Sequence, residues 1–314
     1  MKKTFSILSV IVLSVLLVAC GPSNDGFKED ANIVVYTRDT TSGTRAGFME
    51  GIGFKEASAN DSLLVQGFVT QDNTQIFTSM QTDEYGIGYI SLSTLNNQIK
   101  GLNFEGVKPT VPNVLNDTYG LKRPFMYMTR ASGDYASETV EQLVEAFVAF
   151  LGTTDAADII NNSGAIALPA TQTWDDIKAN HPITNQDNSG VTVRFGGSDS
   201  IQKVAEALTN AFKPKAGNFI AEHDHTGSGD AFKRTWDPAV KDTSVGKDVG
   251  FSSRPFTASE IAGSDVEHTG QLAWDAIVAI VHKNNPVSNI TAEQLKGIYN
   301  GTYKTWGAIL EAQA

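Results

Sequence analysis

The chain has 314 residues, with 24 Lys and Arg against 35 Asp and Glu, so its formal net charge is -11. This acidic excess, without any basic run, excludes nonspecific nucleic-acid binding, which needs Lys and Arg to displace counterions from phosphates. A single cysteine excludes a disulfide framework and a zinc site built from several cysteines. The length allows two domains, and 41% hydrophobic residues exclude wholesale disorder.

The first 20 residues have the pattern of a secretory signal peptide. Lys2 and Lys3 precede an apolar stretch over 5–19, which is shorter than a membrane-spanning helix. The stretch ends in Leu-Val-Ala-Cys20, which resembles the bacterial lipobox, where cleavage precedes the cysteine and its thiol is acylated. We therefore predict a signal peptide over 1–19 and a lipid anchor on Cys20, in preference to an uncleaved membrane helix.

Residues 20–31 are polar and carry Gly and Pro, which is typical of a flexible tether. Beyond them, short apolar runs alternate with segments of helical period, which indicates an α/β protein. The expected strands are 33–37, 86–92, 124–129, 191–195, 249–252 and 276–282. The expected helices are 137–151, 200–212 and 292–299, the last opened by a Thr291–Gln294 capping box. The polar stretch 170–189 is predicted to be a linker or surface excursion between two halves.

Three loops of one kind stand out, at 40–45, 196–200 and 226–229, each rich in Gly, Ser or Thr and each placed before a helical segment. The first turn of a helix has free N–H donors and a positive dipole end, glycine lets the backbone approach a ligand, and hydroxyls add donors. One such loop alone is equally well explained as an ordinary helix cap. Three of them, with Arg38 just before the first, favour an anion site.

These loops resemble those of a known family. Arg38 and the following Ser42-Gly-Thr-Arg45 resemble the anion-gripping motif of phosphate-binding proteins, the solute receptors of bacterial phosphate ABC transporters. Further stretches that agree with the family are 85–92, 197–201, 226–229, 249–254 and 285–291 with its continuation to Trp306. The resemblance covers nearly all of residues 31–314.

The order of these motifs departs from that family. There, the strand and loop found here at 191–201 come first, and the arginine motif directly follows the tryptophan-containing stretch. In this chain the Arg38 motif lies at the opposite end from Trp306, while 166–169 resembles a family C-terminus and runs on to the family-like start at residue 191. We therefore predict a circular permutation with its join near 170–190, which is tolerated where the original termini lie close together.

The resemblance implies an α/β, two-lobed periplasmic-binding-protein-like fold of type II, with two crossover strands as the hinge. The lobe with the Arg38 motif is expected to comprise 32–92 and 285–314, and the second lobe 93–284. In the cleft, Arg38 would bind a tetrahedral oxyanion through charge-assisted hydrogen bonds. The other expected ligand-binding residues are Ser42, Gly43 and Thr44 from one lobe and Ser198, Asp199, Ser200, Ser228 and Ser253 from the other.

Two positions bear on which oxyanion is bound. Ser253 stands where some phosphate receptors carry an Asp that accepts the ligand's proton and repels fully ionised sulfate. Asp199 stands where the family often has Thr. It either replaces the missing proton acceptor or caps the next helix. Capping is slightly favoured because Asp is a strong N-cap. Asp39 and Asp230 are further acceptor candidates, with a solvated surface role as the default.

Other polar groups are given structural roles. The segment His223-Asp-His225 has metal-like spacing but is placed in a solvated polar loop, so no metal and no cofactor is expected. Arg254 either pairs with a carboxylate at the cleft edge or faces the ligand. The four tryptophans fit packing better than a sugar platform.

The expected function is that of a monomeric lipoprotein on the extracytoplasmic face, which captures inorganic phosphate and delivers it to an ABC permease without being an enzyme. A receptor for another tetrahedral oxyanion is the nearest alternative. A surface phosphate-ester hydrolase would use Ser228 or Ser42 as nucleophile, but Ser228 lacks the GxSxG elbow and no triad partners are recognisable. A surface scaffold or adhesin is the third alternative.

Overall fold

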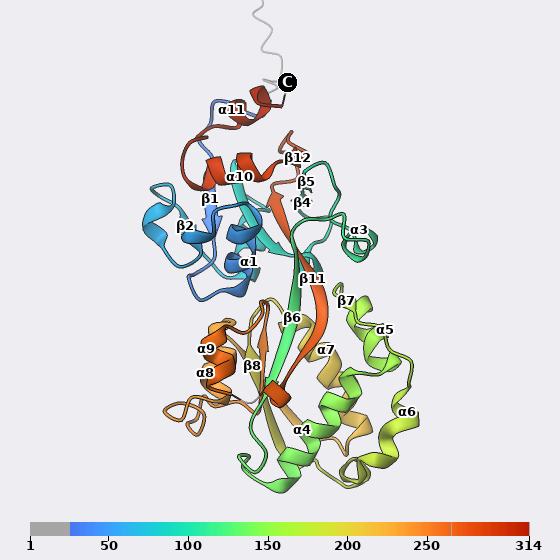
Figure 1. Ribbon diagram of the computed structural model, residues 1–314. Helices are drawn as coiled ribbons and strands as arrows, with labels where there is room; N and C mark the ends of the chain where they lie inside the picture. The colour runs from blue at the N-terminus through green and yellow to red at the C-terminus, as the bar shows by residue number, and fades with distance from the viewer. Residues whose placement is uncertain (1–25, 265, 314) are drawn as a thin grey trace, which may run out of the picture.

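The computed structural model describes residues 26–264 and 266–313, which fold into two lobes stacked end to end (Figure 1). The signal peptide and Cys20 lie outside the described residues. Two long antiparallel strands, β6 (Lys122–Thr129) and β11 (Thr269–Val281), run from one lobe into the other. The expected α/β, two-lobed fold with two crossover strands is confirmed.

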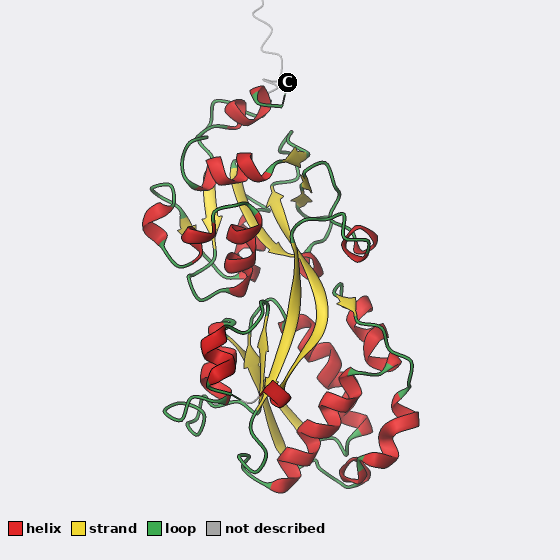
Figure 2. Cartoon of the chain, in the orientation of Figure 1, coloured by secondary structure: helices red, strands yellow, loops and turns green. Residues whose placement is uncertain are grey.

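One mixed sheet passes through both lobes in the order β2-β1-β3-β11-β6-β10-β8-β9. Figure 2 shows these strands in yellow with helices against them in both lobes. The first-lobe strands are β1 (Val34–Thr37), β2 (Val69–Thr70), β3 (Gly86–Ser91), β4 (Lys100–Gly101), β5 (Asn103–Phe104) and β12 (Asn289–Ile290). The second-lobe strands are β7 (Ile166–Ala167), β8 (Thr192–Gly197), β9 (Ile220–His225) and β10 (Val249–Ser252).

The helices cover the faces of this sheet. Those of the first lobe are α1 (Gly43–Gly51), α2 (Asn73–Ser79), α3 (Val111–Leu115), α10 (Ala292–Tyr299) and α11 (Trp306–Glu311). Those of the second lobe are α4 (Glu138–Leu151), α5 (Thr154–Asn162), α6 (Trp174–Ile177), α7 (Gln202–Phe212), α8 (Gly229–Thr235) and α9 (Ala258–Ala262). Among the described residues, none of these helices is long and apolar enough to cross a bilayer.

The expected elements form where apolar periodicity and caps agree. Helix α4 begins after Ser137, whose hydroxyl accepts a hydrogen bond from the backbone N–H of Val140, and it buries a stripe that includes Leu143 and Phe147. The Thr291–Gln294 capping box is present at α10. Strand β11 is longer than expected, since it starts at Thr269 rather than at residue 276.

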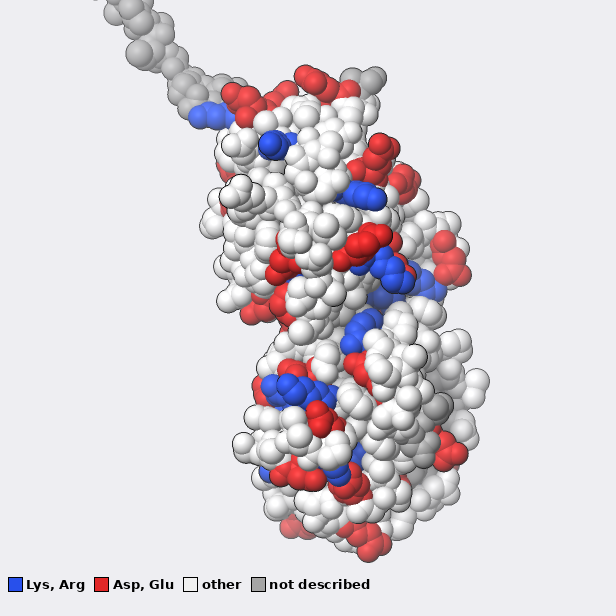
Figure 3. All heavy atoms as spheres, turned by 60° about the vertical axis from the view of Figure 1, so that its left-hand side comes forward, with Lys and Arg blue, Asp and Glu red and all other residues white. Residues whose placement is uncertain are grey.

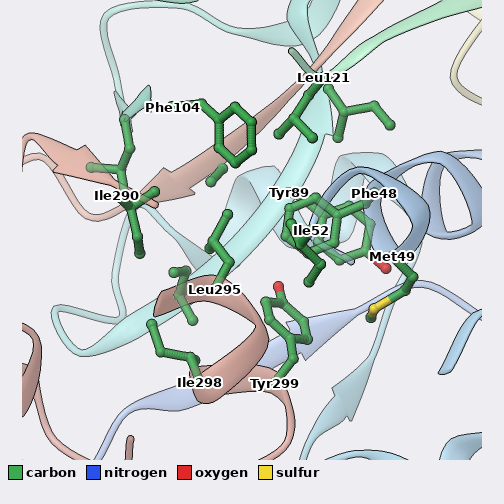
Figure 4. Close-up of a cluster of buried hydrophobic side chains, with 14 of the residues drawn as sticks. Phe48, Met49, Ile52, Tyr89, Phe104, Leu121, Ile290, Leu295, Ile298 and Tyr299 are labelled. Carbon is green, nitrogen blue, oxygen red and sulfur yellow. The ribbon is translucent and has the colours of Figure 1, made fainter. Parts of the chain in front are cut away.

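Each lobe has its own apolar core, and the first core corrects the expected lobe boundary. Figure 4 shows Phe48 stacked on Tyr89 beside Phe104 and Leu121, and Phe48 and Tyr89 have ring centroids 4.0 Å apart. Residues 102–121 and the end of β11 from Ala276 therefore pack in the lobe that carries Arg38. The division at residues 92 and 285 was wrong because sequence order does not reveal where a crossover strand changes lobe.

The polar stretch 170–189 is also different from the expected linker. It forms α6 and two 3₁₀ turns within the second lobe, where Trp174 is 2% exposed and lies edge-on to Phe150 and Phe212. The Asn188 amide donates hydrogen bonds to the carbonyl oxygens of Ile183 and Ala216. Trp174 and Ile183, which is 4% exposed, anchor this polar segment to the second-lobe core.

The two ends of the described chain lie side by side in the first lobe (Figure 1). Asn32 forms a β-bridge with Thr305, and the backbone N–H of Ile33 donates to the carbonyl of Lys304 at 2.8 Å. The Trp306 indole donates to the Tyr85 carbonyl at 3.0 Å. The predicted permutation requires this proximity.

Candidate anion site between the lobes

The candidate site lies where four strands end. Arg38 directly follows β1, and Ser198, Thr226 and Ser253 follow β8, β9 and β10. Strand β8 pairs in parallel with both β9 and β10, so the carboxyl ends of these three strands meet at one edge of the second lobe. Ligands of open α/β sheets bind at such an edge.

Glycines allow the loops to approach one another. Gly197 has φ of +99°, and a Cβ there would lie 2.2 Å from the carbonyl oxygen of Phe251. A Cβ on Gly43, at the start of α1, would lie 2.4 Å from the Ser228 hydroxyl and 2.7 Å from that of Ser253. The first turn of α1 therefore faces the second-lobe hydroxyls directly. Ser42 caps this helix through the backbone N–H of Arg45.

The predicted hydroxyl groups gather at the junction of the lobes, and one contact crosses it. Ser198 donates to the Ser253 hydroxyl at 2.9 Å, and the Ser228 and Ser253 hydroxyls lie 3.1 Å apart. The hydroxyls of Thr44 and Ser200, one from each lobe, lie 2.6 Å apart. Each of these five side chains is buried. The structure thus brings together donors from both lobes in one solvent-shielded cluster.

Arg38 and Asp199 form an ion pair within this site. Nη2 of Arg38 lies 2.7 Å from both carboxylate oxygens of Asp199, and its Nη1 donates to the Thr44 hydroxyl at 3.3 Å. Arg38 is 1% exposed, and its Nε has no hydrogen-bond partner among the described residues. The backbone N–H of Asn73 donates to the same carboxylate at 3.3 Å.

This pair overturns the preference for Asp199 as a helix cap. Helix α7 has Ile201 at its N-cap position and no side-chain cap. The Asp199 carboxylate points instead toward a buried guanidinium in the other lobe, because a charge-assisted contact stabilises it more than a neutral cap. The carboxylates of the other acceptor candidates do not pair with the Arg38 guanidinium: that of Asp39 accepts from the Thr41 backbone N–H, and that of Asp230 accepts from the Thr226 hydroxyl.

Two residues that support Arg38 were not predicted as site residues, although Arg45 and Tyr89 lie within the stretches that resemble the family. The Tyr89 hydroxyl accepts from the backbone N–H of Arg38 at 3.1 Å. The fully buried Arg45 donates to the Arg38 carbonyl at 2.9 Å and to the Ala57 carbonyl. These contacts fix the backbone N–H and carbonyl of Arg38.

A second buried ion pair lies in the hinge. Arg123 on β6 donates from Nε and Nη2 to one oxygen of Asp275 on β11, and Ser91 on β3 donates to the other. Burial raises the pKa of Asp275, while Arg123 and Ser91 oppose that rise. The pair joins the strands that connect the lobes.

A cavity of about 430 Å³ opens beside Arg38 and Asp199. Its walls come from both lobes, with Gln71 and Gln75 on one side and Gln202 and His225 on the other. Figure 3 shows acidic and basic side chains interspersed over the face in view, without an extended basic patch. A polar opening therefore leads from solvent to the buried arginine.

The remaining polar candidates have structural partners. The Arg254 guanidinium pairs with Glu260 at 2.8 and 2.9 Å, so it serves α9 rather than the site. The His223-Asp-His225 segment forms part of strand β9 and was wrongly placed in a loop. Among the described residues, no group of three or more His, Cys, Asp or Glu is arranged to hold a metal ion.

Comparisons with known proteins agree with this fold and site. Residues 174–313 match the model of the PBP superfamily domain. The chain is 28% identical over 313 residues to "Phosphate-binding protein PstS 2" of Streptococcus pneumoniae serotype 4, covering 98% of this chain and 99% of the relative. The resemblance to phosphate-binding proteins is confirmed.

Two further relatives extend this result. "Phosphate-binding protein PstS 2" of Streptococcus agalactiae serotype V is 26% identical, with 97% of each chain covered. The crystal structure of a phosphate ABC transporter, phosphate-binding protein from Streptococcus pneumoniae TIGR4 has a TM-score of 0.63 at 24% identity, covering 89% of this chain and all of that one. The periplasmic-binding-protein-like fold is thereby confirmed.

The alignments with the PstS 2 proteins run through both chains from end to end, so these relatives share the segment order of this chain. A permutation relative to phosphate receptors with the other motif order stays a prediction.

Proposed function

We propose that this protein is an extracytoplasmic solute-binding lipoprotein that captures inorganic phosphate between its lobes and delivers it to an ABC permease. The observation that carries the proposal is the buried Arg38, which lies among hydroxyl groups of both lobes with its Nε unpartnered among the described residues. The relatives named as phosphate-binding proteins support the choice of ligand.

A tetrahedral oxyanion suits this arrangement because it has acceptor lone pairs in every direction. The α1 terminus offers backbone N–H groups, Arg38 offers a guanidinium, and Ser198, Ser228 and Ser253 offer hydroxyls. These hydroxyls now bond to one another, so a ligand would enter as the lobes part and would take over their donors on closure.

Asp199 gives the site a means of discrimination. Its carboxylate accepts from Arg38 and Asn73 and is partly buried, with 16% of the side chain exposed, at the edge of the buried hydroxyl cluster. A protonated phosphate oxygen can donate to such an acceptor, whereas sulfate, which carries no proton at neutral pH, meets only repulsion. In this proposal Asp199 accepts the proton of phosphate. Some phosphate receptors use an Asp for that purpose at the position where this chain has Ser253.

The alternatives fit less well. A receptor for another tetrahedral oxyanion would use the same donors. Binding measurements with several oxyanions distinguish such a receptor from a phosphate receptor. For a hydrolase, the hydroxyl of Ser228 contacts the Ser253 hydroxyl and backbone N–H, and neither group can remove its proton. A scaffold or adhesin would need no buried arginine between hydroxyls.

Anchoring belongs to the same proposal. We place the lipid on Cys20, outside the described residues, and the mature protein on the extracytoplasmic face as a monomer. The described chain starts against the first lobe, where the Glu29 carbonyl accepts from the Gly307 backbone at 2.7 Å and the Phe27 ring lies 5.3 Å from that of Tyr85. The tether would therefore join the lobe that holds Arg38.

Calorimetry with phosphate, arsenate, sulfate and nitrate tests the ligand, and incubation with a chromogenic phosphate ester tests for turnover. We expect one phosphate per chain, weaker or no sulfate binding and no ester hydrolysis. Ester turnover that is abolished by Ser228→Ala would establish the hydrolase instead. Absence of saturable binding to any of these anions would favour the scaffold.

A further inference from the structure

Strand β9 carries two histidines, His223 and His225, that lie outside the donor set of the proposed site. Because they are two residues apart on a strand, both rings lie on one face, with centroids 5.4 Å apart and planes at 15°. His223 stacks on Phe195 and His225 on Phe251. The intervening Asp224 pairs elsewhere, with Arg234 and Lys247.

The two rings form a hydrogen-bonded chain that starts at the anion site. The carbonyl of Ser198, whose hydroxyl belongs to the site, lies 3.0 Å from Nδ1 of His225. Nε2 of His225 lies 3.1 Å from Nδ1 of His223, and Nε2 of His223 lies 2.9 Å from the Thr209 hydroxyl. That hydroxyl also reaches the Glu206 carbonyl, at 3.1 Å.

When both imidazole rings are neutral, this series of hydrogen bonds has one hydrogen too few. It consists of four contacts between two carbonyl oxygens, and carbonyls only accept, so four hydrogens are needed. Thr209 supplies one hydrogen and each neutral imidazole supplies one. One added proton on the histidine pair satisfies every contact.

In the protonated arrangement His225 carries a hydrogen on both ring nitrogens, and every group in the series donates to the next one. His225 donates from Nδ1 to the Ser198 carbonyl and from Nε2 to Nδ1 of His223. His223 then donates from Nε2 to Thr209, and Thr209 donates to the Glu206 carbonyl. When both rings are neutral and His225 keeps its Nδ1–H on the Ser198 carbonyl, one of the other three contacts lacks its hydrogen.

The charges around the pair determine when the proton is held. Burial lowers the pKa of His223 to about 4 and lowers that of His225 as well, which favours neutral rings in the unloaded protein. The groups that face the two rings are Glu206, Asp199 and Asp224, which favour the proton, and Lys213 and Lys247, which oppose it. Arg38 lines the same cavity as His225 and opposes it too.

We propose that the His223–His225 pair takes up one proton from solvent when phosphate binds. This inference rests on the proposed function. A phosphate beside Arg38 adds negative charge to the wall of the cavity that His225 lines and offsets the guanidinium, so the protonated pair becomes more stable. The proton compensates part of the ligand's charge and strengthens the hydrogen bond that holds the Ser198 carbonyl.

Proton uptake on binding makes the phosphate affinity depend on pH. Because the pKa of the pair is higher in the loaded protein than in the unloaded protein, phosphate binding strengthens as pH falls through the interval between these two values. A rise of one pKa unit corresponds to about a tenfold gain in affinity over that interval.

Nitrogen-15 NMR of the full mature chain with labelled histidine tests the proposal directly. The five histidines can be assigned by single substitutions. We expect saturating phosphate to raise the apparent pKa of His225 by about one unit or more, with a hydrogen on Nε2 of His223 in the loaded protein. Unchanged titration curves with phosphate bound would overturn the proposal and leave the proposed function intact. Lack of phosphate binding would overturn both.

Substitution of His223 gives a second readout. His223→Phe keeps a ring between its stacking neighbours but removes the acceptor for His225. In His223→Phe we expect the gain in phosphate affinity between pH 7 and pH 5 to be smaller than that of wild type, by up to about tenfold. His181→Phe is the matched control, because His181 also stacks on an aromatic ring, that of Trp174, outside this chain. The ionisation of phosphate itself is common to all three proteins, so equal pH profiles would contradict the proposal.

Discussion

Both carboxylate oxygens of Asp199 lie 2.7 Å from Nη2 of Arg38, so an acid of the second lobe is paired with the buried base of the first. The two residues are 161 positions apart in the sequence. A buried guanidinium needs a negative partner, and Asp199 provides it in this structure. Under the proposed function, phosphate would share Arg38 with this carboxylate, which would couple ligand binding to the contact between the lobes.

Arg38→Ala should weaken phosphate binding by about tenfold or more, because it removes a charge-assisted contact of roughly 1.5 to 3 kcal/mol. Titration calorimetry measures the change. Arg254→Ala is the control, since Arg254 pairs with Glu260 and should leave the affinity unaltered. Ser42→Ala and Ser228→Ala should each cost less than Arg38→Ala because backbone donors remain. An Arg38→Ala protein with wild-type affinity would remove Arg38 from the site.

Asp199→Asn should narrow the difference between the phosphate and sulfate dissociation constants, by about tenfold, since it removes the repulsion of sulfate and an acceptor for the phosphate proton. Competition binding with the two anions at neutral pH gives the ratio. Asp39→Asn is the matched control, because Asp39 lies next to Arg38 in sequence but contacts Thr41. An unchanged ratio in Asp199→Asn would leave Asp199 as a structural partner of Arg38 alone.

A circularly permuted variant should fold and bind phosphate if residue 314 is joined to residue 31 by a short linker and the chain is opened between Ser189 and Gly190. The bridge between Asn32 and Thr305 shows that the ends to be joined are close. An opening at Trp174 would cut a packed segment, so the new termini belong after the buried Asn188. Circular dichroism and calorimetry report folding and binding. Failure to fold beside a stable parent would count against the permutation.

Cys20→Ala should release the protein from the membrane or block its processing, while the purified soluble domain binds phosphate as before. Carbonate washing of membranes followed by immunoblotting distinguishes anchored from released protein. Cys20 is the single thiol of the chain, so no other cysteine can replace it. Persistent membrane association of Cys20→Ala would contradict the lipobox assignment.

The sequence predicts those elements whose local pattern and tertiary environment agree. Strand β10 was expected at 249–252 and has these bounds, because a short apolar run between polar segments is buried on both faces. Strand β9 was missed, since its Ile-Ala-Glu-His-Asp-His sequence pairs through the backbone while polar groups alternate along an edge. Tertiary pairing decided its conformation.

In the candidate site, too, some residues are predictable from the local sequence pattern and others only from the tertiary structure. Arg38 and the serine loops are recognisable because strand, glycine and hydroxyl occur together. Asn73 carries no such pattern, and the stretch that contains Tyr89 was recognised without a role for this side chain, so both contacts become visible only in the fold. The role of Asp199 could not be read from its position before α7, because a cap and an ion pair use the same carboxylate and the arginine that decides between them is in the other lobe.

Titration of the wild-type protein with inorganic phosphate in the presence of excess sulfate, at neutral pH, tests the central claim most directly. We predict saturable binding of one phosphate per chain, with sulfate displacing it poorly even at about hundredfold excess, because such discrimination requires about 3 kcal/mol between the two anions. Sulfate that competes on equal terms would reduce the protein to a general oxyanion receptor, and absence of saturable phosphate binding would contradict the account altogether.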